Sequence, residues 1–363
     1  MRNAFRPIIA SPLARLTLAF ALLIGAASPS TATFVNPDVV KGTTLFEGYS
    51  SATHIGSRRL FAWSVEVGRI GTDLAAYVET NGGTVTHINA KRTTAYVGGF
   101  DQGTDRVIFQ QTSGGDSDLF LYDIGDAKRT PISRLNDEHW QWNPSIDSHR
   151  GTTWITYGVN RFGGPGAKWR LFLFNGSTGE RTLLAETTNR CGCLFPGTIA
   201  YPWVTWAVGD DATAWRYDIR TGERTPLLPT DADEYGVAVT PEGTAYVARS
   251  GNRCGVGAAL YRVKLNGAPY LLHEMPDDKE AANLNVDFIG PHDRLYFDQR
   301  NCRNGTADVL RLRRADLVGQ PARWPARLAW AATGGGRSGG GGRSGGGGFR
   351  PSGASPDASP RTR

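Results

Sequence analysis

The feature that most constrains the fold of this chain is an internal repeat of short hairpin patterns. Each copy has an alternating apolar segment, a turn containing polar residues or glycine, and a second apolar segment, which together indicate a β-hairpin. In chain order the copies lie at 73–86, 118–132, 169–184, 215–227, 260–272 and 309–312. The last copy is expected to pair with residues 327–330. The sequence therefore predicts six related units.

The spacing of these copies identifies the kind of repeat. Equivalent positions in the six copies are Tyr77, Tyr122, Phe174, Tyr217, Val263 and Leu312. Their separations are 45, 52, 43, 46 and 49 residues. A period of roughly 40–50 residues is typical of a β-propeller blade.

Each hairpin is also preceded by an apolar strand, and a further short strand precedes that one. The apolar strands are expected at 59–63, 106–109, 153–157, 203–207, 244–248 and 294–297. No helical periodicity occurs outside the N-terminal segment. We therefore expect an all-β fold, a six-bladed β-propeller of four-stranded antiparallel blades. A stacked β-solenoid has shorter coils and lacks this hairpin order.

The units resemble a known kind of repeat. Pro241-Glu242-Gly243, directly before the strand at 244–248, and Tyr217-Asp218-Ile219-Arg220-Thr221-Gly222 are similar to the two halves of the WD40-like repeat of the TolB-like propeller family. Tyr122-Asp123-Ile124 matches part of the second half. The resemblance implies the propeller fold over nearly the whole body, and these motifs encode blades without implying a shared activity.

The N-terminal segment is typical of an export signal. Arg2, Arg6 and Arg15 precede or open an apolar run at 16–27, and the small residues 30–32 follow it. The run is shorter than the about 20 residues that a membrane-spanning helix needs. We therefore expect residues 1–32 to be a cleaved signal peptide, with an uncleaved anchor as the alternative. The mature protein is expected to be secreted, or to lie in the periplasm or cell envelope, as a monomer without a transmembrane segment.

The C-terminal segment, residues 334–363, is rich in Gly, Ser, Pro and Arg. Such a composition buries too little apolar surface to fold, so we expect a disordered tail. An RNA-binding or envelope-binding segment is the alternative. The two ends also carry the excess of positive charge that gives the chain its net charge of +6, which leaves residues 33–333, the predicted propeller, nearly neutral. A nucleic-acid-binding face is therefore not expected.

The four cysteines, Cys191, Cys193, Cys254 and Cys302, fit an exported protein with two disulfides, for which three pairings are possible. The expected topology places all four on one face of the propeller. We favour Cys254–Cys302, which joins neighbouring blades, together with Cys191–Cys193. Zinc is the alternative, but no histidine lies near these cysteines in the sequence.

Catalytic motifs are not evident. The chain has no G-x-S-x-G pattern, and its six histidines show no metal-ligand spacing. Acidic clusters at 116–118, 210–211, 231–234 and 277–278 leave calcium open as an alternative, although none has the spacing of a known calcium loop. We therefore predict no catalytic residue, metal or cofactor.

The candidate binding residues lie on the face where the long connections are expected. They are Trp140 and Trp142 before the third unit, and Arg253 and Arg300 beside two of the cysteines. The tryptophans could stack on a sugar or peptide, or fill the space between blades. The first hypothesis is a non-enzymatic propeller that binds a protein, peptide or envelope glycan. The alternatives are a propeller enzyme of the lactonase or sugar-dehydrogenase type, with a metal or quinone in the central channel, and a structural surface-display module.

Overall fold

The structure of the chain is a computed structural model. It describes residues 38–41, 46–67, 74–80, 83–137, 139–160, 168–188, 194–208, 213–228, 234–249, 257–288, 294–313, 317 and 320–321, and of residues 38–41, 235 and 320–321 it describes the backbone alone. The predicted signal peptide and the predicted tail lie outside these ranges, so both assignments stay predictions. All described strands belong to the compact unit Phe34–Arg363.

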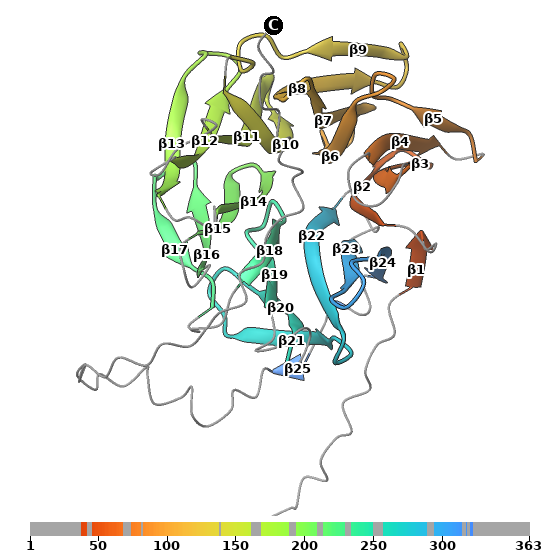
Figure 1. Cartoon of the computed structure of the whole chain (residues 1–363). Helices are drawn as coiled ribbons and strands as arrows, with labels where there is room; N and C mark the ends of the chain where they lie inside the picture. The colour runs from red at the N-terminus through yellow and green to blue at the C-terminus, as the bar shows by residue number, and fades with distance from the viewer. Residues whose placement is uncertain are drawn as a thin grey trace, which may run out of the picture. The chain divides into compact units, whose positions relative to one another are not determined.

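Six antiparallel sheets surround a common centre (Figure 1). Blade 1 holds β2 (Glu47–Ile55), β3 (Arg58–Glu66), β4 (Leu74–Thr80) and β5 (Val85–His87); blade 2 holds β6 (Thr94–Phe100), β7 (Arg106–Ser113), β8 (Asp116–Asp123) and β9 (Lys128–Pro131); blade 3 holds β10 (Trp140–His149), β11 (Thr152–Asn160), β12 (Trp169–Asn175) and β13 (Arg181–Thr187).

The remaining three sheets follow in chain order. Blade 4 holds β14 (Leu194–Ala200), β15 (Trp203–Val208), β16 (Thr213–Asp218) and β17 (Arg224–Pro226); blade 5 holds β18 (Glu234–Val239), β19 (Ala245–Arg249), β20 (Ala259–Val263), β21 (Pro269–Glu274) and β25 (Gln320–Pro321); blade 6 holds β22 (Lys279–Asp287), β23 (Arg294–Asn301), β24 (Ala307–Arg313) and β1 (Asp38–Lys41). The predicted all-β, six-bladed propeller is confirmed. The six positions aligned by sequence all fall on the third strand of their blades.

The outer strand of blade 6 differs from the prediction. Residues 327–330, expected to fill this place, lie outside the described residues. The place is taken by β1, which pairs antiparallel with β24 and brings Asp38 opposite Arg311 and Val39 opposite Leu310. The last blade is therefore built from both ends of the chain, and its first strand in sequence closes the ring.

Apolar clusters fill the six seams between neighbouring blades. In the described residues, the seam between blades 5 and 6 holds the largest cluster, fifteen buried side chains. The seam between blades 6 and 1 holds the smallest, with five: Ala52, Phe61, Trp63, Tyr296 and Val309. Because burial of apolar surface is the main stabilising term, the seam that closes the ring gains the least hydrophobic stabilisation from the described side chains.

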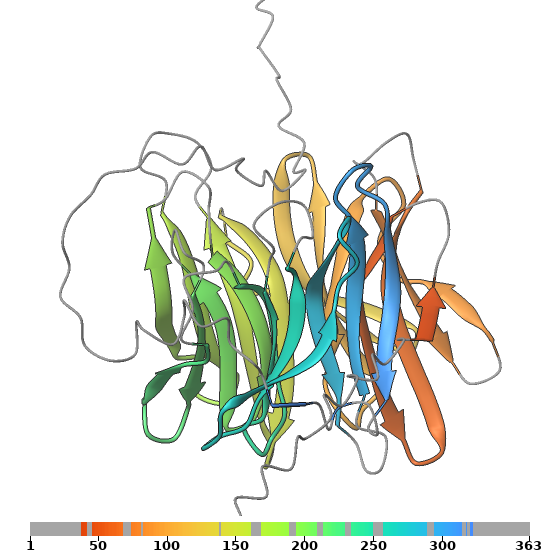
Figure 2. The same ribbon diagram turned by 90° about the horizontal axis from the view of Figure 1, so that it is seen from below.

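The two faces of the propeller differ in their connections (Figure 2). We define the loop face as the one where each inner strand begins, so that it carries the links between blades and the turns between second and third strands. At this face eight residues separate the end of β11 from the start of β12, and nine separate β19 from β20, whereas the opposite face carries tight turns such as 56–57 and 150–151. Long loops on a rigid scaffold are where binding groups usually lie.

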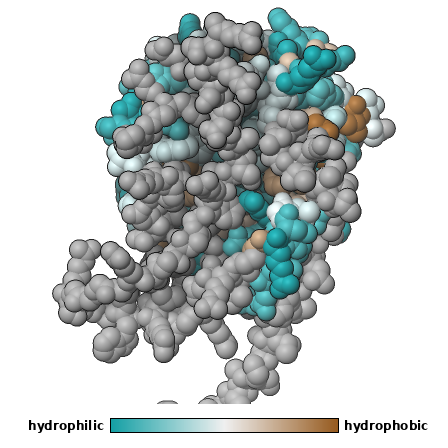
Figure 3. All heavy atoms as spheres, in the orientation of Figure 1, coloured by the Kyte–Doolittle hydropathy of each residue, from teal (hydrophilic) through white to brown (hydrophobic). Residues whose placement is uncertain are grey.

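Hydrophilic side chains cover much of the described surface in the view of Figure 3. The exposed large apolar side chains in the described residues are scattered over several strands and turns: Val67, Val85, Leu183 and Leu265. None of the described segments is a helix with the length and apolar character needed to cross a membrane.

Candidate functional site

The inner strand of every blade has an irregular register at about the same level of the channel. The shifts fall between Gly48 and Ser51, Val97 and Gly99, Trp142 and Ser145, Pro196 and Ile199, Glu234 and Gly236, and Ala282 and Asn285. A β-bulge adds an unpaired residue and turns the local backbone away from its neighbour. Six bulges in register therefore form a ring of irregular backbone around the centre.

Three of the six bulges share one backbone conformation. Tyr49, Asn143 and Asn283 in blades 1, 3 and 6 have φ values of 51°, 42° and 47°. Asparagine tolerates this left-handed region, but tyrosine adopts it rarely. The conformation of Tyr49 is therefore held by its surroundings rather than by its own preference.

Glycines allow the bulged strands to approach one another closely. A Cβ atom on Gly98 would lie 2.1 Å from the carbonyl oxygen of Pro144 in the next blade. A Cβ on Gly197 would lie 2.6 Å from the carbonyl oxygen of Val237. The inner backbones thus nearly touch across two seams, and this narrows the channel.

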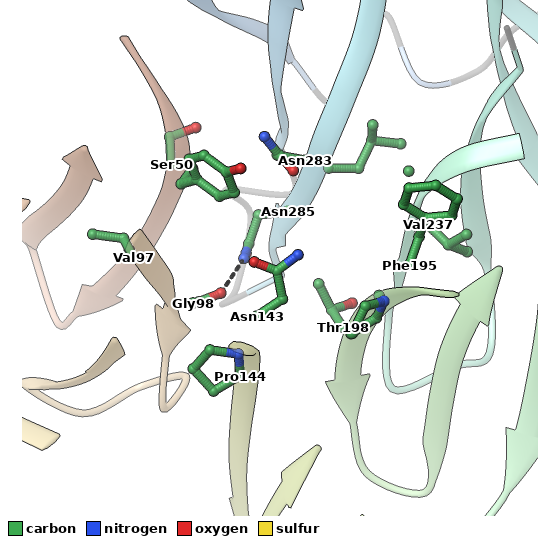
Figure 4. Close-up of a pocket in the computed structure, with 15 residues that line it drawn as sticks. Ser50, Val97, Gly98, Asn143, Pro144, Phe195, Thr198, Val237, Asn283 and Asn285 are labelled. Carbon is green, nitrogen blue, oxygen red and sulfur yellow. Dashed lines mark hydrogen bonds between the residues drawn. The ribbon is translucent and has the colours of Figure 1, made fainter. Parts of the chain in front are cut away.

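The space that remains at the ring is a cavity of about 60 Å³. Inner strands of all six blades line it, with a polar part that includes Ser50, Asn143 and Asn285, and an apolar part that includes Phe195 and Val237 (Figure 4). Pockets for drug-sized ligands measure roughly 300–1,000 Å³. The cavity has room for a few water molecules or one small chemical group.

Asn285 connects three blades at the cavity. Its Nδ2 donates to the carbonyl oxygen of Gly98 at 3.5 Å (Figure 4), and its Oδ1 accepts from Ser51 Oγ at 3.2 Å. The hydroxyl of Ser50, a lining residue that is 2% exposed, has no hydrogen-bond partner in the described part of the chain. The cavity therefore offers amide and hydroxyl groups, and its lining contains no carboxylate or imidazole among the described residues.

A carboxyl group that the sequence reasoning missed lies directly behind this lining. Asp298 on β23 is 1% exposed, and its Oδ2 accepts from the backbone N–H of Tyr49 at 2.9 Å and from Asn283 Nδ2 at 2.6 Å. Burial raises the pKa of Asp298 to about 7, although both hydrogen bonds and the charge of Arg300 oppose this shift. Burial likewise raises the pKa of Tyr49. The sequence contains one indication of this group, because Asp298 directly continues the apolar strand predicted at 294–297.

Two of the four predicted binding residues, Trp140 and Arg300, lie at the loop-face ends of their strands. Trp140 begins β10 and is half-buried, and Arg300 lies near the end of β23. Trp142 packs inside the blade 3–4 seam: its ring covers Gly158, where a Cβ would lie 2.3 Å from the indole, and meets Trp169 edge to face at 5.5 Å. Arg253 lies outside the described residues. Binding by these four residues stays a prediction.

Of the four cysteines predicted to form disulfides, the structure describes one, Cys302. Cys302 follows β23 on the loop face, where its backbone N–H donates to the carbonyl oxygen of Asp278 at 3.1 Å. Cys191, Cys193 and Cys254 lie outside the described residues, so the pairing stays a prediction. The described part of the chain contains no group of three or more His, Cys, Asp or Glu side chains placed to hold a metal ion.

Comparisons with known proteins show likeness in fold. No protein-family model matches the chain, and no curated protein matches it in sequence. Solved structures do match. TolB from Acinetobacter baumannii is 10% identical with a TM-score of 0.47, over 71% of this chain and 64% of TolB, which is less than two thirds of that protein. An oligogalacturonate lyase in complex with manganese is 12% identical with a TM-score of 0.47, over 76% of this chain and 84% of the lyase.

A third match is the β-propeller domain of the Trilobed protease from Pyrococcus furiosus, which is 10% identical with a TM-score of 0.44, over 74% of this chain and 95% of that domain. At this level of identity the three likenesses concern the β-propeller architecture and assign no activity. The chain is a six-bladed β-propeller.

Proposed function

We propose that the chain is an exported, non-enzymatic propeller that binds a protein, a peptide or an envelope glycan on its loop face. The observation that carries this proposal is the narrow channel. Among the described residues, the ring of bulges leaves a cavity of about 60 Å³, which supports contact of a larger ligand with a face of the propeller.

The loop face is the better of the two surfaces for such a partner. The strands that hold Trp140 and Arg300 have one end at this face, and here β11 and β12 are separated by eight residues and β19 and β20 by nine. A half-buried indole and a guanidinium are groups that often contribute strongly at binding surfaces. The nearly neutral body favours recognition by shape and hydrogen bonds over general attraction to a charged polymer.

A propeller enzyme is the second candidate, and one observation favours it. Asn143, Asn283 and Asn285 converge on the cavity, and Asp298 behind them has a pKa raised to about 7 by burial. A quinone would not fit the cavity without an opening of the ring. Elemental analysis of the purified protein separates the candidates, because a stoichiometric metal would overturn the non-enzymatic proposal.

Site-specific crosslinking tests the loop-face proposal. A photoreactive amino acid is introduced at Trp140 or Arg300 in the chain that starts at residue 33, and at Ser177 on the opposite face as the control. Ser177 is exposed in the turn between β12 and β13. With envelope extract of the source cells, we expect one discrete crosslinked product from the loop-face positions and none from Ser177. Equal labelling from both faces, or none from the loop face, would contradict the proposal.

A further inference from the structure

The seam between blades 6 and 1 differs from the other seams in what holds it together. Its apolar cluster is the smallest in the described residues. Polar contacts cross it instead, all from side chains of the two innermost strands of blade 6: Asp298 to the backbone of Tyr49, Asn285 to Ser51, and Asp287 to His54. The ring therefore closes on a seam that depends on buried polar groups.

The hydrogen bonding of Asp298 in this seam depends on whether its carboxyl group carries a proton. Its Oδ2 accepts two hydrogen bonds, whereas Oδ1 is buried and has no partner in the described residues. A proton on Oδ1 would leave both accepted bonds intact and remove the charge. Loss of that proton leaves a carboxylate oxygen buried without a donor, which costs free energy.

The two donors to Asp298 are both part of the channel wall. Tyr49 and Asn283 occupy the left-handed positions of the bulges in blades 1 and 6 and line the cavity. A Cβ on Gly48 would lie 2.4 Å from Asp298 Oδ2, so a larger residue at this position would displace the carboxyl group. A change at Asp298 is thus transmitted directly to both bulges.

We propose that the seam between blades 6 and 1 is a proton-sensitive closure of the ring, in which ionisation of Asp298 places a buried charge inside the seam and favours its opening, and the Tyr49 and Asn283 bulges move with it. The inference concerns the propeller itself and holds whether or not the loop face binds a partner. It makes the shape of the channel mouth depend on the pH of the exported compartment.

The groups around Asp298 do not stabilise its charged form sufficiently to remove this dependence. Arg300 on the same strand favours the carboxylate, and Glu280 lies opposite Arg300 in the register of β22 and β23. The titratable groups of β2 are Glu47, Tyr49 and His54, and the ring of Tyr49 lies against Tyr96 of β6 at 4.9 Å. The register neighbours of Asp298 are uncharged, Ala282 on β22 and Val309 on β24.

The first test measures thermal unfolding of the chain starting at residue 33 and of Asp298→Asn from pH 5 to pH 8.5. Because burial raises the pKa of Asp298 above its unfolded value, its protonated form favours the folded state, and stability falls as pH rises through about 7. We expect the melting temperature of the unmodified chain to fall by roughly 2–6 °C over this range, and Asp298→Asn to remove much of that fall.

Asp147→Asn is the matched control. Asp147 is a buried carboxyl that accepts a backbone N–H, from Tyr201 at 2.7 Å, but in the seam between blades 3 and 4. Burial raises its pKa only to about 6. We expect this variant to keep the fall in melting temperature between pH 6.5 and 8.5. A fall of the same size in all three proteins would overturn the proposal.

Two further readouts locate the effect and do not depend on a variant that folds. Hydrogen exchange, corrected for intrinsic rates, should lose protection between pH 5.5 and 8.5 at the amides of β2 and β22 more than at those of β10 and β14. Carbon-13 NMR of the Asp298 carboxyl should show a midpoint near 7. A midpoint below 5, or loss of protection centred on the blade 3–4 seam, would refute the proposal.

Discussion

His54 and Asp287 face each other across the seam that closes the ring, with Nδ1 of His54 2.6 Å from Oδ2 of Asp287 and side-chain exposures of 5% and 0%. They lie near the ends of β2 and β22, toward the face opposite the loops, whereas Asp298 acts nearer the loop face. The seam with the smallest apolar cluster is thus held by polar side chains at both ends. A buried polar group that has a partner is costly to remove, because the partner that remains keeps its desolvation penalty.

Replacement of His54 by alanine should therefore destabilise the protein strongly. Removal of one partner of a buried pair costs roughly 3–5 kcal/mol, and we expect a loss near the lower end of this range in urea-induced unfolding. His139→Ala is the control, since His139 makes the same kind of contact with Asp137 at 3.0 Å but with side chains 30% and 36% exposed. It should cost less than about 1 kcal/mol. Equal losses for the two variants would show that the closing seam gains nothing from the buried pair.

The ring of bulges leads to a prediction about Gly98. A Cβ there would lie 2.1 Å from the carbonyl oxygen of Pro144, so Gly98→Ala must push two inner strands apart. We expect a loss of about 2–3 kcal/mol, within the range for overpacked interiors, measured by chemical unfolding. Gly267→Ala is the control, because its Cβ would meet Lys264 Cβ at 3.3 Å in an exposed turn. A Gly98→Ala protein as stable as the Gly267→Ala protein would mean that the inner strands can separate at little cost.

The sequence was sufficient to predict the blades because their strands repeat a pattern. The third strands share alternating apolar residues, and two of the turns that follow share Thr-Gly-Glu-Arg-Thr. The closing strand β1 could not be recognised in this way. It is four residues long, matches no repeat, and pairs with β24 at the other end of the described chain.

The candidate site was harder to predict, because a β-bulge has no common sequence. The bulges centre on residues as different as Tyr49, Asn143 and Gly197, and their alignment becomes apparent only when the six inner strands meet. Asp298 resembles an ordinary strand-end aspartate in sequence. The packing of blade 1 against blade 6 supplies one of its two donors, the backbone N–H of Tyr49, and the other donor, Asn283, lies on β22 of the same blade.

Trp142 illustrates a further limit. Trp140 and Trp142 are two residues apart on one strand, so both point to the same side of the sheet, and the sequence offers no means to tell them apart. Trp142 packs into the apolar cluster of the blade 3–4 seam, whereas Trp140 lies at the edge, opposite Asn160. Trp142→Ala should therefore cost about 3 kcal/mol of unfolding free energy. Trp140→Ala should cost less than half as much, and comparable losses in guanidinium unfolding would contradict this difference.

Asp147, in the seam between blades 3 and 4, leads to a prediction about how the stability of the protein depends on pH. Burial is the main cause that raises the pKa of Asp147 to about 6, and the nearby Asp101 adds to it. The folded state therefore binds the proton more tightly than the unfolded state, and stability falls as pH rises from about 4 to about 6. Asp147→Asn should be more stable than the unmodified chain at pH 7 and similar to it at pH 4, as measured by urea unfolding at the two pH values. A stabilisation that is the same at both pH values would assign the effect to packing.

The last prediction concerns the strand that closes the ring. A chain that lacks residues 33–41 loses β1, which leaves the edge of β24 unpaired and exposes part of the smallest apolar seam. We expect a melting temperature lower by several degrees than that of the chain starting at residue 33, and association that increases with concentration, because open strand edges pair with other chains. Removal of residues 334–363 is the control and should change neither property. Light scattering and thermal unfolding of the three chains provide the measurement. If loss of residues 33–41 changed neither the melting temperature nor the mass, β1 would be dispensable for closure, and the contacts of His54, Ser51 and Tyr49 with blade 6 would be sufficient to hold the ring.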